Sequence, residues 1–147
     1  MKKGFTLLEI LLVIAAIGVL AAIVIVAINP TRQLAQVRNT VRRNDLSTIS
    51  RAFAQYDIDN ARYPTGLTNT YQEICAQDAS DCTGYYDAES SLVPTYIAQI
   101  PQDPSSTGNG SGYEIGINPE NNVIMVRAIN AELSQIIEIN GSEVVIY

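Results

Sequence analysis

Few residues in this 147-residue sequence have the chemistry that catalysis requires. It contains no histidine, which excludes catalytic triads and metal sites built on imidazole. Lysine occurs only at Lys2 and Lys3, and there is no glycine-rich phosphate-binding loop. The acids Asp57 and Asp59 are interpreted as part of a helix-ending turn on the solvated surface, not as a metal site. We therefore predict that the protein is not an enzyme and uses no metal or other cofactor.

One carboxylate stands where a charge is costly. Glu9 lies at the start of an apolar stretch, Ile10–Ile28, which contains only Ile, Leu, Val, Ala and Gly. As a helix rising about 1.5 Å per residue, this stretch is roughly 28 Å long, close to the hydrocarbon thickness of a bilayer. An ordinary signal peptide fits poorly, because the preceding charged run is very short and no Ala-x-Ala-like cleavage site follows. Glu9 is therefore a candidate functional residue at the end of a membrane-spanning helix.

The apolar helix is preceded by a specific motif, the segment Lys3-Gly4-Phe5-Thr6-Leu7-Leu8-Glu9. This motif resembles the class III leader of the type IV pilin superfamily, which includes type IV pilins, competence pilins and type II secretion pseudopilins. The resemblance implies that a membrane peptidase cuts between Gly4 and Phe5 and that Phe5 is then N-methylated. It also implies that Glu9 pairs with the amino terminus of a neighbouring subunit. The alternative is a plain single-span anchor in which Glu9 is incidental.

Other parts of the chain carry the same resemblance. Tyr56–Thr65 is similar to the segment after the long helix of major pseudopilins, and Leu92–Pro104 is similar to the connector that leads into the family's sheet. Gly18 matches a glycine where helices of this family loosen on assembly, whereas the family's usual proline falls one helical turn earlier than Pro30. Pseudopilins generally continue after the connector with Trp-Gly and carry an acidic calcium-binding loop. This chain has no tryptophan and continues with the Ser- and Gly-rich loop 105–112, which favours a pilus-type subunit.

The first half of the chain reads as one long helix, roughly residues 5–58. Asn29-Pro30 is a pair that can kink it, and Asp59 with the turn residues that follow should end it. Beyond Pro30 an apolar stripe recurs at three- to five-residue steps and is expected to pack on a sheet. Its members are Leu34, Val37, Val41, Leu46, Ile49, Phe53 and Tyr56.

The second half is strand-like, so the predicted fold is α+β: a long helix packed on an antiparallel sheet of about four strands. The alternating, β-branched segments are 113–117, 123–129, 134–139 and 143–147. Asn140-Gly141 is a strong hairpin turn between the last two. The expected organisation is a leader (1–4), an apolar membrane or filament-core helix (5–30) and a head (31–147), the head comprising an amphipathic helix (31–59), a variable loop region (60–112) and the sheet (113–147).

The head contains two cysteines, Cys75 and Cys82. Two cysteines without histidine give too few soft ligands for a metal, and their spacing is not that of a Cys-x-x-Cys redox motif. In an extracytoplasmic head the pair suggests one disulfide that closes a small loop. The chain-entropy argument assigns such a loop roughly 2–3 kcal/mol.

Charge is distributed unevenly along the chain. Residues 29–43 contain four arginines and no acid, whereas residues 44–147 contain 14 Asp or Glu and three Arg. This acidic head does not favour nucleic-acid binding. Counting the basic residues that flank the span would place the head in the cytoplasm. The resemblance implies the reverse, and we follow it because the leader must reach a cytoplasm-facing peptidase.

The sequence therefore predicts a structural subunit of an extracellular type IV pilus-like filament, with Glu9, Gly18 and Pro30 as assembly residues. The expected partners are other copies of the chain, a prepilin peptidase and methylase, and an inner-membrane assembly platform. The precursor is expected in the cytoplasmic membrane with its head outside, and the mature subunit in a cell-surface filament. The alternatives are a type II secretion pseudopilin and a membrane-anchored ectodomain that does not polymerise.

Overall fold

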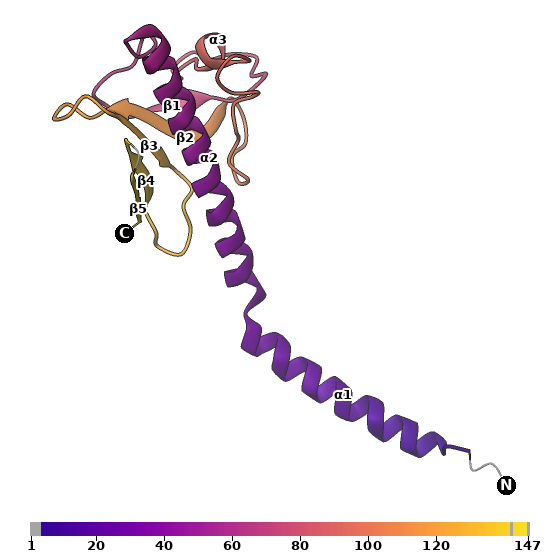
Figure 1. Ribbon diagram of the computed structural model, residues 1–147. Coiled ribbons are helices and arrows are strands. Elements are labelled where there is room, and N and C mark those ends of the chain that lie inside the picture. Colours follow the sequence, from indigo (N-terminus) through magenta and orange to yellow (C-terminus); the bar gives the residue numbers. More distant parts are fainter. Residues whose placement is uncertain (1–3, 142, 147) are drawn as a thin grey trace. The chain divides into compact units, whose positions relative to one another are not determined.

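The computed structural model describes residues 4–141 and residues 143–146 (Figure 1). The chain forms two compact units, residues 1–35 and residues 36–147. The first contains helix α1 (Leu7–Ile28) and the start of helix α2 (Pro30–Asn60). The second unit, called the head from here on, contains the rest of α2, the short helix α3 (Glu89–Leu92) and a β-sheet.

The two long helices are separated at a single residue, Asn29. Its backbone is left-handed, with φ 47° and ψ 75°, which ends α1. Its side-chain oxygen accepts hydrogen bonds from the Thr31 hydroxyl at 2.8 Å and the Arg32 amide at 3.3 Å, which caps the start of α2. Pro30 takes the first position of α2, where an amide hydrogen is not needed. The single long helix predicted over residues 5–58 is therefore two helices, and the predicted interruption at Asn29-Pro30 is confirmed. The predicted helix end near Asp59 lies one residue from the observed end.

The head contains a five-stranded antiparallel sheet in the order β1-β2-β3-β4-β5. The strands are β1 (Gln72–Cys75), β2 (Gly110–Ile117), β3 (Ile124–Ala128), β4 (Ile137–Asn140) and β5 (Glu143–Ile146). The predicted meander of four strands is confirmed as β2–β5. Strand β1 was not predicted; it adds to the free edge of β2 from within the region expected to be loop.

Two strand ends differ from the predictions for local reasons. Strand β2 starts at Gly110, three residues before the predicted start, because Gly110 pairs with Cys75 of β1. Strand β4 starts at Ile137, since Leu133 and Ser134 both have positive φ and cannot lie in an extended strand. The last predicted strand residue, Tyr147, lies outside the described residues.

One face of α2 packs with the inner face of the sheet in a single hydrophobic cluster. The helix contributes Leu46, Ile49 and Phe53, and the sheet contributes the buried residues Tyr113, Ile115, Val126, Ile137 and Ile139. Figure 1 shows α2 running across the strands. The predicted apolar stripe is thus confirmed at its carboxyl-terminal end.

The prediction is wrong for the amino-terminal part of the apolar stripe, which is exposed. Leu34, Val37 and Val41 are 56%, 60% and 38% exposed. At this level the buried face of α2 carries Ala35, Asn39 and Arg42 instead, and these residues continue the spacing of Leu46, Ile49 and Phe53 toward the amino terminus. A polar network therefore occupies the place where an apolar contact was expected.

Candidate processing and assembly site

The residues of the leader motif lie around the first turn of α1. Thr6 has an extended backbone (φ −82°, ψ 149°) and caps the helix, because its hydroxyl accepts a hydrogen bond from the Glu9 amide at 3.3 Å. Glu9 lies in the first turn, where the helix dipole favours a negative charge. Among the described residues no cation pairs with its carboxylate. Lys2 and Lys3 lie outside the described residues.

The bond between Gly4 and Phe5 lies before α1, in a segment without helical hydrogen bonds. Both residues are exposed, and a side chain added at Gly4 would meet nothing within 4 Å. The structure thus gives Gly4 no packing role within the described part of the chain. A need for glycine at this position would have to come from another molecule that approaches the backbone.

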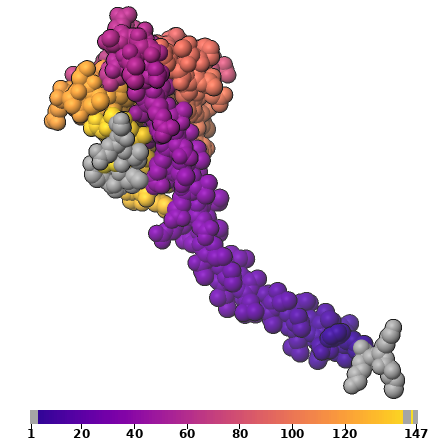
Figure 2. All heavy atoms as spheres, viewed as in Figure 1, coloured from indigo at the N-terminus to yellow at the C-terminus, as the bar shows by residue number. Residues whose placement is uncertain are grey.

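Helix α1 has no residue that is buried by the described part of the chain. The helix has 22 residues, and its most apolar 18-residue stretch has a mean hydropathy of 3.3. It is therefore long and apolar enough to cross a membrane. A Cβ built on Gly18 would also meet nothing within 4 Å, which leaves that side of the helix open to close approach. Figure 2 shows the side chains of α1 in indigo. An apolar surface of this kind needs lipid or other helices as cover.

The head contains an ionic network that sequence reasoning missed. The guanidinium of Arg42 donates to both carboxylate oxygens of Asp103, at 2.6 Å and 3.1 Å, and both side chains are fully buried. Arg42 also contacts Glu132 at 3.0 Å, and Arg38 binds both oxygens of Glu132 at 2.7 Å. Hydrogen bonds from Arg38 and then from Arg42 lower the pKa of Glu132 to about 2.

This network ties α2 to two separate segments of the head. Asp103 belongs to the connector that enters the sheet, and Glu132 belongs to the β3–β4 loop. Asn39 holds the same loop by bonding to both the carbonyl (2.8 Å) and the amide (3.0 Å) of Glu132. One sequence signal could have placed Arg42 in the interior. It lies four residues before Leu46, and this spacing keeps it on the core-facing side of α2. The chemistry is structural, since every charge in the buried pair is matched.

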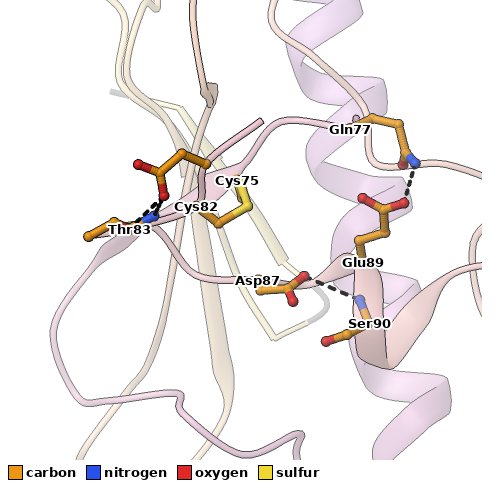
Figure 3. The surroundings of a disulfide bond; sticks show 8 residues. Cys75, Gln77, Cys82, Thr83, Asp87, Glu89 and Ser90 are labelled. Carbon is orange, nitrogen blue, oxygen red and sulfur yellow. Dashed lines mark hydrogen bonds between the residues drawn. A yellow bond between two sulfur atoms is a disulfide. The ribbon is translucent and has the colours of Figure 1, made fainter. Parts of the chain in front are cut away.

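The structure joins Cys75 and Cys82 in a disulfide. Figure 3 shows it together with hydrogen bonds of the surrounding segment, in which the Ser90 amide donates to Asp87 and the Gln77 side chain donates to Glu89. The Thr83 amide donates to the Asp81 carboxylate in the same segment. The disulfide links the end of edge strand β1 to the loop that follows it. Among residues 4–141 and 143–146, no three His, Cys, Asp or Glu side chains are grouped so that they could hold a metal ion.

Fold and motif together define a class, the type IV pilin superfamily, with an amino-terminal helix apolar and long enough to cross a membrane and an α+β head. A family profile described as "Prokaryotic N-terminal methylation motif" matches residues 1–25. Several relatives over most of the chain are described as type II secretion system core protein G. The relative from Klebsiella pneumoniae is 33% identical over 114 residues, which are 78% of this chain and 74% of the relative.

Relatives from other organisms agree. The core protein G of Klebsiella michiganensis and that of Pseudomonas aeruginosa are each 32% identical over 103 residues, covering 70% of this chain and 68% of the relative. No solved structure gives a significant match. The chain belongs to the type II secretion system core protein G family. The missing tryptophan after the connector therefore does not separate it from pseudopilins.

Proposed function

We propose that this chain is a pseudopilin-type structural subunit that polymerises through α1. The observation that carries the proposal is the uncovered apolar surface of α1, since no residue of this helix is buried by the described part of the chain. Such a helix is held by lipid in the precursor and by the helices of other copies in a filament. The methylation motif over residues 1–25 and the relatives described as type II secretion system core protein G support the same function.

Proteolytic processing creates a cation that can pair with the carboxylate of Glu9. Cleavage between Gly4 and Phe5 frees the amine of Phe5, which is then methylated and keeps its positive charge. Within one helix this amine lies four residues before Glu9, and in a filament the amine of a neighbouring copy reaches the same place. Two opposite charges in a water-poor core neutralise each other, and removing either one leaves the other unpaired. This pairing sets the axial position at which each new subunit docks.

Gly18 and Pro30 are proposed to act in assembly through the backbone. Gly18 leaves one side of α1 open to a neighbouring helix and has no side chain to stiffen it. Pro30 starts α2 without donating an amide hydrogen, so a change in the chain at Asn29 breaks no hydrogen bond at Pro30. The proposed partners are other copies of the chain, the prepilin peptidase and methylase, and an inner-membrane assembly platform.

The proposed location follows from what covers α1, which is lipid in the precursor and other copies of the helix in the filament. The precursor spans the cytoplasmic membrane once, with the head outside, and the mature subunit lies in a filament that starts at that membrane. A pilus-type filament at the cell surface is a second candidate. It is favoured by one observation, the absence of an acidic calcium loop after the connector.

Electron microscopy of cells that make the chain together with its peptidase tests the proposal. Antibodies against the head are expected to label filaments, and the labelled material is expected to leave the membrane fraction after shearing or detergent extraction. If the chain stays in the membrane as a monomer while the peptidase is active, the proposal is wrong and the non-polymerising ectodomain is favoured. Labelling at the cell surface or only inside the envelope separates the pilus-type filament from the pseudopilus.

A further inference from the structure

A groove of about 450 Å³ runs along one flank of α2 in the head. Its helix side is lined by Val41, Asp45 and Thr48, and its other side by the connector residues 97–99, 101 and 102. Val41 and Thr48 are exposed, so the groove is open to solvent. Figure 2 shows α2, in purple and magenta, with the salmon-coloured connector region on one side and sheet residues in orange and yellow on the other.

Asp45 is a partly buried acid without a cation. One of its oxygens accepts a hydrogen bond from the hydroxyl of the buried Tyr113 at 2.6 Å. Burial raises the pKa of Asp45; the Tyr113 hydrogen bond acts against this shift, and the nearby charge of Asp103 adds to it. The guanidinium of Arg42 is bound to Asp103 and Glu132, and no cation among the described residues forms an ion pair with Asp45. A cation supplied from outside would therefore find a carboxylate that is poorly solvated and uncompensated.

The opposite flank of α2 carries a cation without an acid. Arg51 is exposed and forms no ion pair among the described residues. It lies six residues after Asp45, which places it about 9 Å further along the helix and about 120° around its axis. The two groups are therefore on different sides of one rigid helix, and neither can satisfy the other within the same copy.

The charge of the head limits how copies can meet. Residues 36–147 contain 14 Asp or Glu and six Arg, so unspecific contact between two heads is repulsive. Arg38, Arg42 and Arg127 are paired with carboxylates inside the copy. Arg51 is one of the few cations left to offset this repulsion, and it extends from the part of α2 that is fixed by the core.

We propose that Arg51 of one copy enters the groove of the next copy and pairs with its Asp45. This inference rests on the proposed filament function and adds a second contact to the one made by α1. Because the acid and the cation lie on different flanks, each copy offers one of each, so the contact is heterologous and passes from copy to copy. A heterologous contact of this kind suits an open filament and also selects copies of this chain over other acidic heads.

Two substitutions and two matched controls test the contact. Arg51→Gln and Asp45→Asn each remove one charge with little change in size, and the asparagine side chain introduced by Asp45→Asn can still accept the Tyr113 hydrogen bond. Each is expected to lower the yield of filaments by about tenfold or more, as for other partly desolvated charge pairs. Arg62→Gln and Asp57→Asn change the net charge equally at other sites and are expected to keep the wild-type yield. Thermal unfolding of each variant shows whether the head still folds.

Cysteine crosslinking tests proximity directly. Arg51→Cys and Gln99→Cys, made as separate single variants and expressed together, are expected to give a disulfide-linked dimer within filaments that neither variant gives alone. Arg62→Cys with Gln99→Cys is the matched control. Intact mass must show that the bond between Cys75 and Cys82 is retained. If wild-type filaments form but the pair does not crosslink and the neutral variants assemble normally, the contact is wrong. If no wild-type filament forms, the proposed function itself fails.

Discussion

At the residue scale, Glu9 and Arg42 are two charged residues next to apolar parts of the chain, and they differ in whether they have a partner of opposite charge. Arg42 is fully buried and finds Asp103 and Glu132 within the head. Glu9 finds no cation among the described residues. A charge that is kept in an apolar setting without an internal partner is expected to have an external one. The residues that matter for assembly are therefore those whose partners are missing from the single chain.

Replacing Glu9 by valine is expected to leave membrane insertion, cleavage and head folding unchanged and to abolish filaments or reduce them sharply. The reason is that the amine of Phe5 loses its partner in the filament core. Glu9→Asp is expected to assemble poorly as well, because its shorter side chain does not reach the amine. Filament yield per processed subunit is the measurement. A normal yield from Glu9→Val would leave Glu9 as an incidental surface residue and would refute the pairing.

Arg42→Met is expected to destabilise the head by about 3–5 kcal/mol, because it leaves the buried carboxylate of Asp103 without its cation. Urea unfolding of a soluble fragment that begins at Thr31 gives this difference. Arg51→Met, which removes an exposed arginine from the same helix, is the matched control and should change stability little. Equal effects of the two substitutions would show that the buried network contributes nothing specific.

The Glu132 ion pairs predict a pH dependence of stability. The pKa of Glu132 is lowered from its usual 4.5 to about 2 in the folded head. The stabilisation is therefore present above pH 4.5 and is lost as the pH falls from there toward 2. Unfolding of the wild-type fragment and of Glu132→Gln should differ most near neutral pH, and the difference should vanish once the pH falls to the lowered pKa. A difference that stays constant over this range would contradict the assigned pairs.

At the element scale, the regular patterns were predictable and the local exceptions were not. The unbroken apolar composition of Ile10–Ile28 is enough to predict α1, and alternation of β-branched residues is enough to predict β2–β5. Helix α2 shows why the rest was missed. Hydrophobic periodicity selects apolar side chains, so it followed Val37 and Val41, whereas the buried face there contains Asn39 and Arg42. Only the partners of these two residues, 61 to 96 positions away, make them suited to the interior.

Strand β1 was missed for a related reason. It has four residues, two of them polar, and it is defined by pairing with β2 and by the adjacent disulfide more than by its own sequence. The disulfide could be anticipated from two cysteines in a head without histidine. The addition of β1 to the edge of the sheet could not be anticipated, because it depends on the segment around Cys75 lying next to β2 in the fold.

Cys75→Ser is expected to loosen the loop that follows β1 and to leave the rest of the sheet folded. The crosslink closes a loop of only a few residues, so its loss costs roughly 2–3 kcal/mol in the chain-entropy model. Hydrogen exchange should show lost protection in residues 72–86 and unchanged protection in β2–β4. Global loss of protection would mean that the disulfide supports the whole head.

At the scale of the whole chain, the count of basic residues and the leader motif predict opposite orientations of the head. The four arginines that follow α1 suggested a cytoplasmic head when they were counted as topology signals. In the folded head, Arg38 and Arg42 are bound to carboxylates and Arg43 donates to Gln135. These three arginines therefore have structural roles in the head that do not depend on its orientation in the membrane. The leader motif and the relatives, not the charge count, identify the family.

The central claim is that this chain is cut between Gly4 and Phe5 and then polymerises. The most direct measurement is the intact mass of the chain recovered from purified filaments. It should equal that of residues 5–147 with one added methyl group and one disulfide, and Gly4→Val should give uncut precursor in the membrane and no filaments. Filaments built from a chain that still contains residues 1–4, or normal filaments from Gly4→Val, would contradict the account.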